Sequence, residues 1–181
     1  KELSNADLSG LEVLIKEHIE KDIPLILICK SPHGSGKTMA LIKMVLDALK
    51  KELQEDPRFL YLSGTRSVLK STHNKLKEVI PNLECYLDED GDTVNKFNIQ
   101  TARQLDCGLN SIHHLTHVRG DIVAIDESEE AALWADWHVS TFHNQLIKIM
   151  ANHKICLLLD ADASDGTYSL ATRAQQYSTA K

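Results

Sequence analysis

The chain has 181 residues, of which 43% are hydrophobic and 25% are charged, and its formal net charge is -6. This apolar content is enough for the core of one compact domain, and it excludes a disordered tail or a disulfide-stabilised miniprotein. The longest apolar runs, such as 23–29, are far shorter than the ~20 residues that cross a bilayer. Because the N-terminus also lacks the apolar segment of a signal peptide, we expect a soluble, cytoplasmic protein with no membrane partner.

The charge is unevenly distributed along the chain. Residues 26–80 contain ten Lys and Arg against five Asp and Glu, whereas residues 81–181 contain seven against fifteen. The overall negative charge excludes a protein that coats nucleic acid through bulk positive charge. A local basic surface in the first half remains compatible with these numbers, and so does a set of lysines that merely solvate exposed helix faces.

In chain order, the first half alternates between helical and extended patterns. Residues 7–21 carry Leu and Ile at three-to-four spacing, which predicts an amphipathic helix. Residues 23–29 form a near-continuous apolar run, typical of a strand buried on both faces of a parallel sheet. The same criteria predict a helix over 37–53, a strand over 59–63 and a helix over 67–80.

The second half continues this alternation with weaker signals. We expect strands over 84–87 and 97–101, separated by a solvated acidic loop at 88–92. Two further apolar runs, 121–126 and 154–160, predict strands on either side of a mainly helical stretch. The whole pattern predicts one α/β domain: a parallel sheet with helices on both faces, joined by right-handed crossovers.

A glycine-bearing turn follows the first predicted strand and precedes the helix over 37–53. Such a turn lets backbone N–H groups point inward at phosphate oxygens, and the following helix adds positive charge at its N-terminus. Lys37 would bridge the β- and γ-phosphates of ATP, and the Thr38 hydroxyl would ligate Mg²⁺. The predicted phosphate-binding residues are Ser31, Gly34, Ser35, Gly36, Lys37 and Thr38.

Two acidic residues end the strand predicted over 121–126. Four apolar residues precede Asp126, so this carboxylate lies at the carboxyl end of a buried strand and is placed to hold Mg²⁺. Glu127 would orient and deprotonate the attacking water. The alternative is a solvated acidic loop, because Glu129 and Glu130 continue the run. The combination of a phosphate cradle with these acids predicts ATP hydrolysis by a P-loop NTPase.

These two motifs resemble motifs I and II of the superfamily 2 helicases. Motif I has a small residue, Ser31, where the general pattern has Gly, and 126–129 looks like the Asp-Glu-x-x box. Residues 62–67 stand where that family has motif Ia, 99–105 look like a later turn that touches nucleic acid, and 158–163 occupy the place of motif III. The Asp-Ala-Asp of motif III is most similar to the herpesvirus origin-binding protein group and its phage and plasmid replication relatives.

The resemblance implies a RecA-like fold, use of ATP with Mg²⁺, and nucleic acid as the partner, DNA rather than RNA. It implies that the loops 64–67 and 101–104 share one rim with the ATP site, because ligands gather at the carboxyl ends of parallel strands. The residues it assigns to nucleic-acid phosphates are Thr65, Arg66, Thr101 and Arg103. Those it assigns to coupling are Asp160 and Asp162. Surface salt bridges are the alternative for both arginines.

Superfamily 2 enzymes have two RecA-like lobes, and 181 residues hold only one. We therefore expect an N-terminal helix at 1–22, a RecA-like ATP-binding lobe at 23–165, and at 166–181 an extension or the start of a link to a second lobe. The expected function is that of a helicase or translocase lobe in DNA replication, phage- or virus-encoded within a host cell. The isolated lobe should be weakly active or inactive.

Two other function classes fit parts of the pattern. A complete small P-loop nucleoside or nucleotide kinase has about this length, but it needs an arginine-rich lid, and Arg119 and Arg173 are isolated. An ATP-dependent scaffold that binds nucleic acid without unwinding it would not need Glu127.

The spacing of cysteines and histidines does not predict a metal centre. The four cysteines form no Cys-x-x-Cys pair, and we interpret them as buried free thiols. His113, His114 and His117 lie within five residues, but no cysteine or carboxylate clearly completes a ligand set, which favours a polar surface. Trp134 and Trp137 could stack on bases, although packing against the sheet is the more common use of such a pair.

Overall fold

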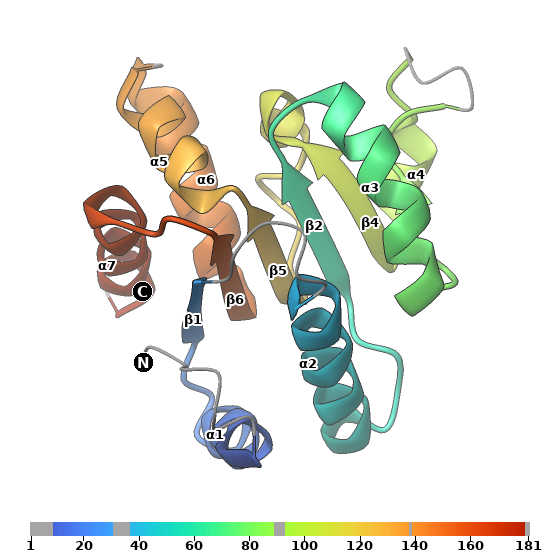
Figure 1. The fold of residues 1–181 in the computed structure, drawn as a ribbon, viewed down its shortest axis with the longest axis vertical. Helices are drawn as coiled ribbons and strands as arrows, with labels where there is room; N and C mark the ends of the chain where they lie inside the picture. The colour runs from blue at the N-terminus through green and yellow to red at the C-terminus, as the bar shows by residue number, and fades with distance from the viewer. Residues whose placement is uncertain (1–8, 31–36, 89–92, 138, 180–181) are drawn as a thin grey trace.

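The computed structural model of the chain describes residues 9–30, 37–88, 93–137 and 139–179. The fold is built on one sheet of six strands in the order β1-β6-β5-β2-β4-β3, with all neighbouring strands parallel. Figure 1 shows this sheet with helices packed around it. The α/β class and the parallel sheet predicted from the sequence are confirmed, and the arrangement of strands and helices is the RecA-like one that the resemblance implied.

The elements are spread over the whole of the described chain. The strands are β1 (Leu25–Lys30), β2 (Phe59–Ser63), β3 (Glu84–Cys85), β4 (Gln104–Gly108), β5 (Gly120–Asp126) and β6 (His153–Asp160). The helices are α1 (Ser9–Glu20), α2 (Lys37–Leu53), α3 (Arg66–Val79), α4 (Lys96–Thr101), the 3₁₀ helix η1 (Leu109–His114), α5 (Ser128–Trp137), α6 (Val139–Ala151) and α7 (Asp165–Thr179).

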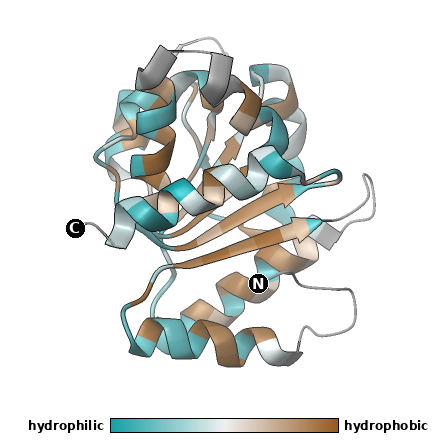
Figure 2. Ribbon diagram, turned by 90° about the vertical axis from the view of Figure 1, so that its left-hand side faces the viewer, coloured by the Kyte–Doolittle hydropathy of each residue, from teal (hydrophilic) through white to brown (hydrophobic). Residues whose placement is uncertain are grey.

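The helices form two groups. Helix α1 packs on α2, and α2 packs on α3, which also contacts β2 and β4. Helices α5, α6 and α7 pack on one another, with α7 reaching β1. Figure 2 shows the strands, hydrophobic along most of their length, between helices above and below them. Helices on both sides exclude water from both faces of the sheet, as the continuous apolar runs predicted.

Burial along the strands follows the same logic. Every residue of β2 and β4 is buried, and so are residues 121–125 of β5 and 155–159 of β6. The predicted helix over 37–53 and the strand over 59–63 match α2 and β2 to the residue. None of the described helices has the length and apolar character that crossing a bilayer requires.

The prediction of a strand over residues 97–101 is wrong, because this segment is helix α4. The Asn95 side chain caps that helix by accepting a hydrogen bond from the Asn98 N–H at 3.0 Å, and Phe97, which suggested a buried strand, is 70% exposed. The strand lies a few residues later, at β4, where Gln104 and Asp106 interrupt the apolar pattern. A buried strand that contains two polar side chains gives no clear periodic signal.

Candidate active site

The strands β1, β6 and β5 end together at one edge of the sheet. Lys30 pairs with Asp160, and Leu159 pairs with Asp126, so the last residues of the three strands lie side by side. Helix α2 begins at Lys37, shortly after β1 ends, and Thr38 in its first turn is half-buried. The predicted phosphate-binding residues Ser31, Gly34, Ser35 and Gly36 lie outside the described residues.

A buried tyrosine holds the first predicted acid. The Tyr61 hydroxyl, from the neighbouring strand β2, donates a hydrogen bond to Asp126 Oδ2 at 2.5 Å. Burial, and then the negative charge of Asp126, raise the pKa of Tyr61 well above its ordinary value, so the hydroxyl stays protonated and remains a donor. This contact fixes the orientation of the Asp126 carboxylate, which is itself half-buried at the end of β5.

The second predicted acid has a strained backbone. Glu127 has a φ of 54°, one of three non-glycine residues in the described chain with a positive φ. Such a conformation is unfavourable for a residue with a side chain and is frequent at functional sites. The Glu127 carboxylate lies close to Gly64, because a Cβ placed on Gly64 would be 3.5 Å from Glu127 Oε2. The loop after β2 and the acidic turn after β5 therefore meet.

Glu129 joins this acidic turn to the segment after β6. Its carboxylate accepts hydrogen bonds from the N–H and hydroxyl groups of Ser164 and Thr167, at 2.6 to 3.1 Å. Burial alone would raise the pKa of Glu129, but these four hydrogen bonds outweigh it and lower the pKa to about 2. The carboxylate thus caps the N-terminus of α7, which begins at Asp165.

The residues assigned to coupling complete this connection. Asp160 Oδ2 accepts a hydrogen bond from the Glu129 N–H at 2.8 Å, and Asp160 Oδ1 accepts one from the Asp162 N–H at 2.8 Å. The Asp162 side chain is exposed, and this residue takes part in the connection through its backbone N–H. Sequence reasoning assigned Asp160 by position but treated Glu129 as part of an acidic run. The Ser and Thr three residues apart at the start of α7 are the signal of a capped helix N-terminus that could have pointed to it.

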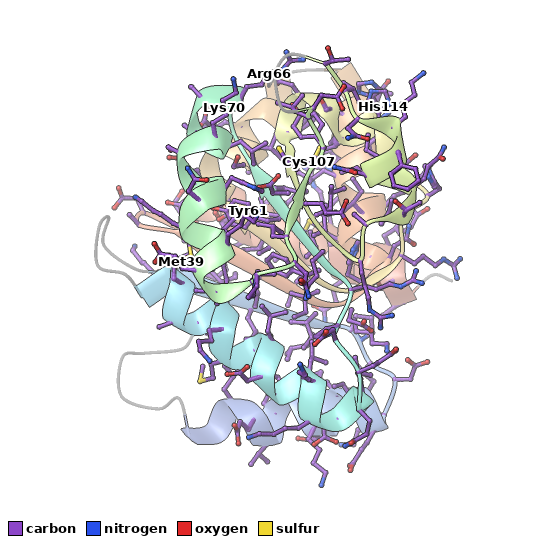
Figure 3. The ribbon with its side chains drawn as sticks, turned by 90° about the vertical axis from the view of Figure 1, so that its right-hand side faces the viewer. Met39, Tyr61, Arg66, Lys70, Cys107 and His114 are labelled. Atoms are coloured by element: carbon purple, nitrogen blue, oxygen red, sulfur yellow. The ribbon has the colours of Figure 1, made fainter. Side chains whose placement is uncertain are left out.

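Two of the four residues assigned to nucleic acid lie at the same edge as these acids. Thr65 follows β2 and caps α3, accepting a hydrogen bond from the Val68 N–H at 3.4 Å. Arg66 is the first residue of α3, and Figure 3 shows it close to Lys70 at the same end of this helix. Both basic side chains are exposed, so this end of α3 is a local basic surface.

The other two lie at the opposite edge, which corrects the expectation that loops 64–67 and 101–104 share one rim. Thr101 and Arg103 precede β4, and the Phe59 N–H at the start of β2 donates to the Arg103 carbonyl at 2.9 Å. The Arg103 side chain pairs with Glu55 at 2.7 Å and donates to the Asp56 carbonyl at 2.6 Å. The segment 97–101 is a helix and not a strand. The loop 101–104 therefore leads into β4, at the edge where strands begin, instead of leaving a strand at the carboxyl edge.

The remaining sequence candidates are histidines of η1 and tryptophans of α5. His113 and His114 lie in η1 with their ring centroids 3.9 Å apart. Within the described residues, neither belongs to a group of side chains that could hold a metal ion. Trp134 and Trp137 lie in α5.

Comparison with known proteins agrees with this arrangement. The sequence profile of the DEAD/DEAH box helicase family matches residues 15–158. No curated protein sequence matches the chain.

Among solved structures, the Sulfolobus solfataricus SWI2/SNF2 ATPase core in complex with dsDNA is similar, with a TM-score of 0.63 and 15% identity over 96% of this chain and 36% of that chain. The T. fusca Cas3–AMPPNP structure has a TM-score of 0.57 and 18% identity over 98% of this chain and 23% of that chain. The chain thus spans about a third of the one structure and a quarter of the other, and at these identities the likeness concerns the fold.

Proposed function

Because the chain belongs to the DEAD/DEAH box helicase family, we propose that it is the ATP-binding and ATP-hydrolysing first lobe of a superfamily 2 DNA helicase or translocase. One observation carries this proposal: β1, β5 and β6 end side by side at the carboxyl edge of the sheet, which brings Asp126, Glu127 and Asp160 to that edge, and α2 begins at Lys37 shortly after β1. In parallel α/β sheets, ligands bind at this edge.

The residues at this edge fit a magnesium nucleotide. Lys37 and Thr38 begin a 17-residue helix directly after the predicted phosphate loop, and a helix N-terminus attracts phosphate. Asp126 supplies a carboxylate, a ligand type that Mg²⁺ prefers, and Tyr61 holds it in place. When bound, Mg²⁺ neutralises charge that develops on the phosphates during transfer. The AMPPNP in the Cas3 structure supports assigning a nucleoside triphosphate to this chain.

We assign the attacking water to Glu127. In this role its carboxylate orients the water and accepts its proton as the water attacks the γ-phosphate. The positive φ of Glu127 supports the assignment, because a backbone strain of about 1–3 kcal/mol persists only where the surroundings impose it, as they do at active sites. The loop at Gly64 lies close to the same carboxylate, so a movement of the Glu127 side chain would also move this loop.

Nucleic acid would bind beside this loop. We propose that Thr65, Arg66 and Lys70 contact backbone phosphates at the exposed end of α3, positioning the strand without reading its sequence. The dsDNA bound to the Sulfolobus SWI2/SNF2 core supports DNA as the partner. Thr101 and Arg103 are not part of this surface, since they lie at the other edge of the sheet.

Coupling between ATP and DNA would pass through Glu129 and Asp160. Glu129 connects the acidic turn to the N-terminus of α7, and Asp160 holds the Glu129 backbone. A shift of the acidic turn on hydrolysis would therefore move α7. We propose that a second RecA-like lobe receives this movement and completes the ATP site. The Asp-Ala-Asp sequence at 160–162 is our reason to place the whole protein in DNA replication, close to the origin-binding group.

The test is to measure ATP turnover with and without single-stranded and duplex DNA. It uses this chain and a longer chain that continues past Lys181. We expect both to bind ATP with Mg²⁺, and DNA to stimulate turnover in the longer chain alone. Lys37→Ala should abolish nucleotide binding, and Arg66→Ala should weaken DNA binding and reduce its salt dependence while leaving nucleotide affinity unchanged. Phosphate transfer to a nucleoside, with no effect of DNA, would contradict the proposal and identify a kinase.

A further inference from the structure

Three side chains that the ATP site does not use lie together on the other half of the sheet. Cys85 in the edge strand β3 pairs in register with Asp106 in β4, so the two side chains project from the same face. Helix α3 packs against β4, and its His73 Nδ1 contacts Asp106 Oδ2. The ligand atoms of His73, Cys85 and Asp106 all lie within 4.8 Å of one another, the one such group in the described part of the chain.

Asp106 is incompletely satisfied for a buried carboxylate. Its side chain is fully buried, yet Oδ1 receives no hydrogen bond of normal geometry from the described residues. A buried polar atom without a partner costs about 1–3 kcal/mol, and more when the group is charged, so native proteins rarely keep one. His73 contacts Oδ2, and the Cys85 thiol also interacts with the Asp106 carboxylate. A ligand that binds Oδ1 together with the two neighbouring side chains would remove this cost.

Solvent reaches the cluster from one side. His73 and Cys85 are partly exposed, the His73 side chain by 19%, and both line an open groove of about 920 Å³. Asn74 and Asn98 also line this groove, as do Lys70 and Lys77 along the same face of α3. An ion can therefore enter from the groove, while Asp106 closes the site from the protein interior.

The geometry points to a zinc site formed by His73, Cys85 and Asp106, with water from the groove as the fourth ligand. An imidazole nitrogen, a thiolate sulfur and a carboxylate oxygen are the three donor types of protein zinc sites, and three protein ligands plus water make an open site. Hard ions such as Mg²⁺ and Ca²⁺ prefer oxygen ligands alone, so the thiol and imidazole select zinc over them. Two anionic ligands also balance the charge of the ion.

Binding has a defined proton balance and a defined structural effect. Zinc binds the deprotonated thiol, so the Cys85 thiol releases its proton to the buffer, and the sulfur, nitrogen and carboxylate electron pairs bind the ion without any change in redox state. The edge strand β3 has two residues, so a metal link from Cys85 to β4 and α3 would stabilise this edge of the sheet. This inference does not depend on the proposed ATPase activity.

The test uses the purified chain after treatment with a chelator. We expect it to bind one Zn²⁺, to unfold at a higher temperature with Zn²⁺ present, and to show a thiolate-to-metal charge-transfer absorption when Co²⁺ replaces zinc. Cys85→Ser should abolish that absorption. Cys85→Ser and His73→Gln should each weaken zinc binding by more than about a hundredfold, since changes outside the ligand set alone cost roughly 10–100-fold.

Two matched variants distinguish this site from adventitious binding. Cys29→Ser removes a thiol of similar burial in β1, and His113→Gln removes an exposed imidazole; both should bind zinc and cobalt as the unchanged chain does. Circular dichroism checks that each variant is folded, and His73→Gln, on the surface of α3, provides a second test if Cys85→Ser unfolds. Absence of stoichiometric zinc binding, or wild-type affinity in the Cys85 or His73 variant, would overturn the inference.

Discussion

The two edges of the sheet treat their polar residues differently. At the amino edge, where the strands begin, several charged groups are paired close by: Asp121 accepts a hydrogen bond from the Arg58 N–H at 2.8 Å and contacts Lys154 at 2.9 Å, and Arg103 pairs with Glu55. At the carboxyl edge, Glu127 has a strained backbone and Asp126 is held by a tyrosine from inside the sheet.

This difference indicates that polar residues at the amino edge contribute mainly to stability and those at the carboxyl edge mainly to function. Pairing at the amino edge satisfies these polar groups locally. Strain and converging acids at the carboxyl edge cost stability, and they are the features expected where substrate binds. Substitutions at the carboxyl edge should therefore change activity more than stability, and those at the amino edge should do the reverse.

The largest expected effect is that of Glu127→Gln at the carboxyl edge. In the longer chain used to test the proposed function, ATP turnover should fall by about 10²- to 10⁴-fold, because the amide cannot accept the proton of the attacking water. Affinity for ATP with Mg²⁺ and the thermal unfolding midpoint should stay close to those of the unchanged chain. Single-turnover hydrolysis and nucleotide titration measure the two quantities. Glu130→Gln, a half-buried acid in the same turn, is the control and should hydrolyse normally. Equal turnover in both variants would remove the assigned base.

At the amino edge, the largest expected effect is a pH dependence of stability set by His153. Burial lowers the pKa of this residue to about 4 from an ordinary value near 6.5. The unfolded chain therefore binds a proton at a higher pH than the folded chain, so stability is fully present above pH 6.5 and is lost as the pH falls towards 4. The loss should reach about 3 kcal/mol.

Urea denaturation between pH 4 and pH 7 measures the free energy of unfolding that this prediction concerns. His153→Gln should flatten the dependence between these limits, whereas His113→Gln, at an exposed position, should retain it. If both variants follow the unchanged chain, His153 is not the group responsible.

Glu129 is an exception to this comparison. It lies near the carboxyl edge, but its carboxylate accepts four hydrogen bonds, so we expect its substitution to affect stability. Glu129→Ala should lower the free energy of unfolding by about 1–2 kcal/mol, because it removes the cap of α7. Since the folded pKa is about 2, this contribution is present above pH 4.5 and is lost as the pH falls towards 2. Chemical denaturation at neutral pH would show it. Glu130→Ala should change stability by less than about 0.5 kcal/mol.

Tyr61→Phe has the smallest expected effect. Removing one hydrogen bond to Asp126 should raise the Mg²⁺ concentration for half-maximal turnover by about 3- to 10-fold, which corresponds to roughly 1 kcal/mol. Tyr86→Phe is a matched control, because the buried Tyr86 hydroxyl has no hydrogen-bond partner in the described chain. That variant should have unchanged Mg²⁺ dependence. An identical response of both variants would show that Tyr61 does not position Asp126.

Much of the fold could be predicted because local periodicity decides it. Helix α2 carries an apolar residue at almost every turn, and β2 and β5 are short apolar runs, so their positions follow from burial alone. Asp126 and Glu127 could be placed at the end of β5 because they directly follow this apolar run. Strand β4 escaped prediction because Asp106 is buried through partners on α3 and β3 that no local window contains.

From the sequence alone, the alternation of strands and helices determined a parallel sheet, and a buried strand ending in two acids determined which edge would carry them. Only the tertiary structure decided which distant side chains meet there: Tyr61 at Asp126, Ser164 and Thr167 at Glu129, and His73 with Cys85 at Asp106. The physical reason is the separation of the interacting residues along the chain. Burial of one face of a helix or strand gives neighbouring residues a periodic hydrophobic pattern, which the sequence shows directly. A hydrogen bond or a metal ligand set instead depends on the register of strands brought together by the whole fold.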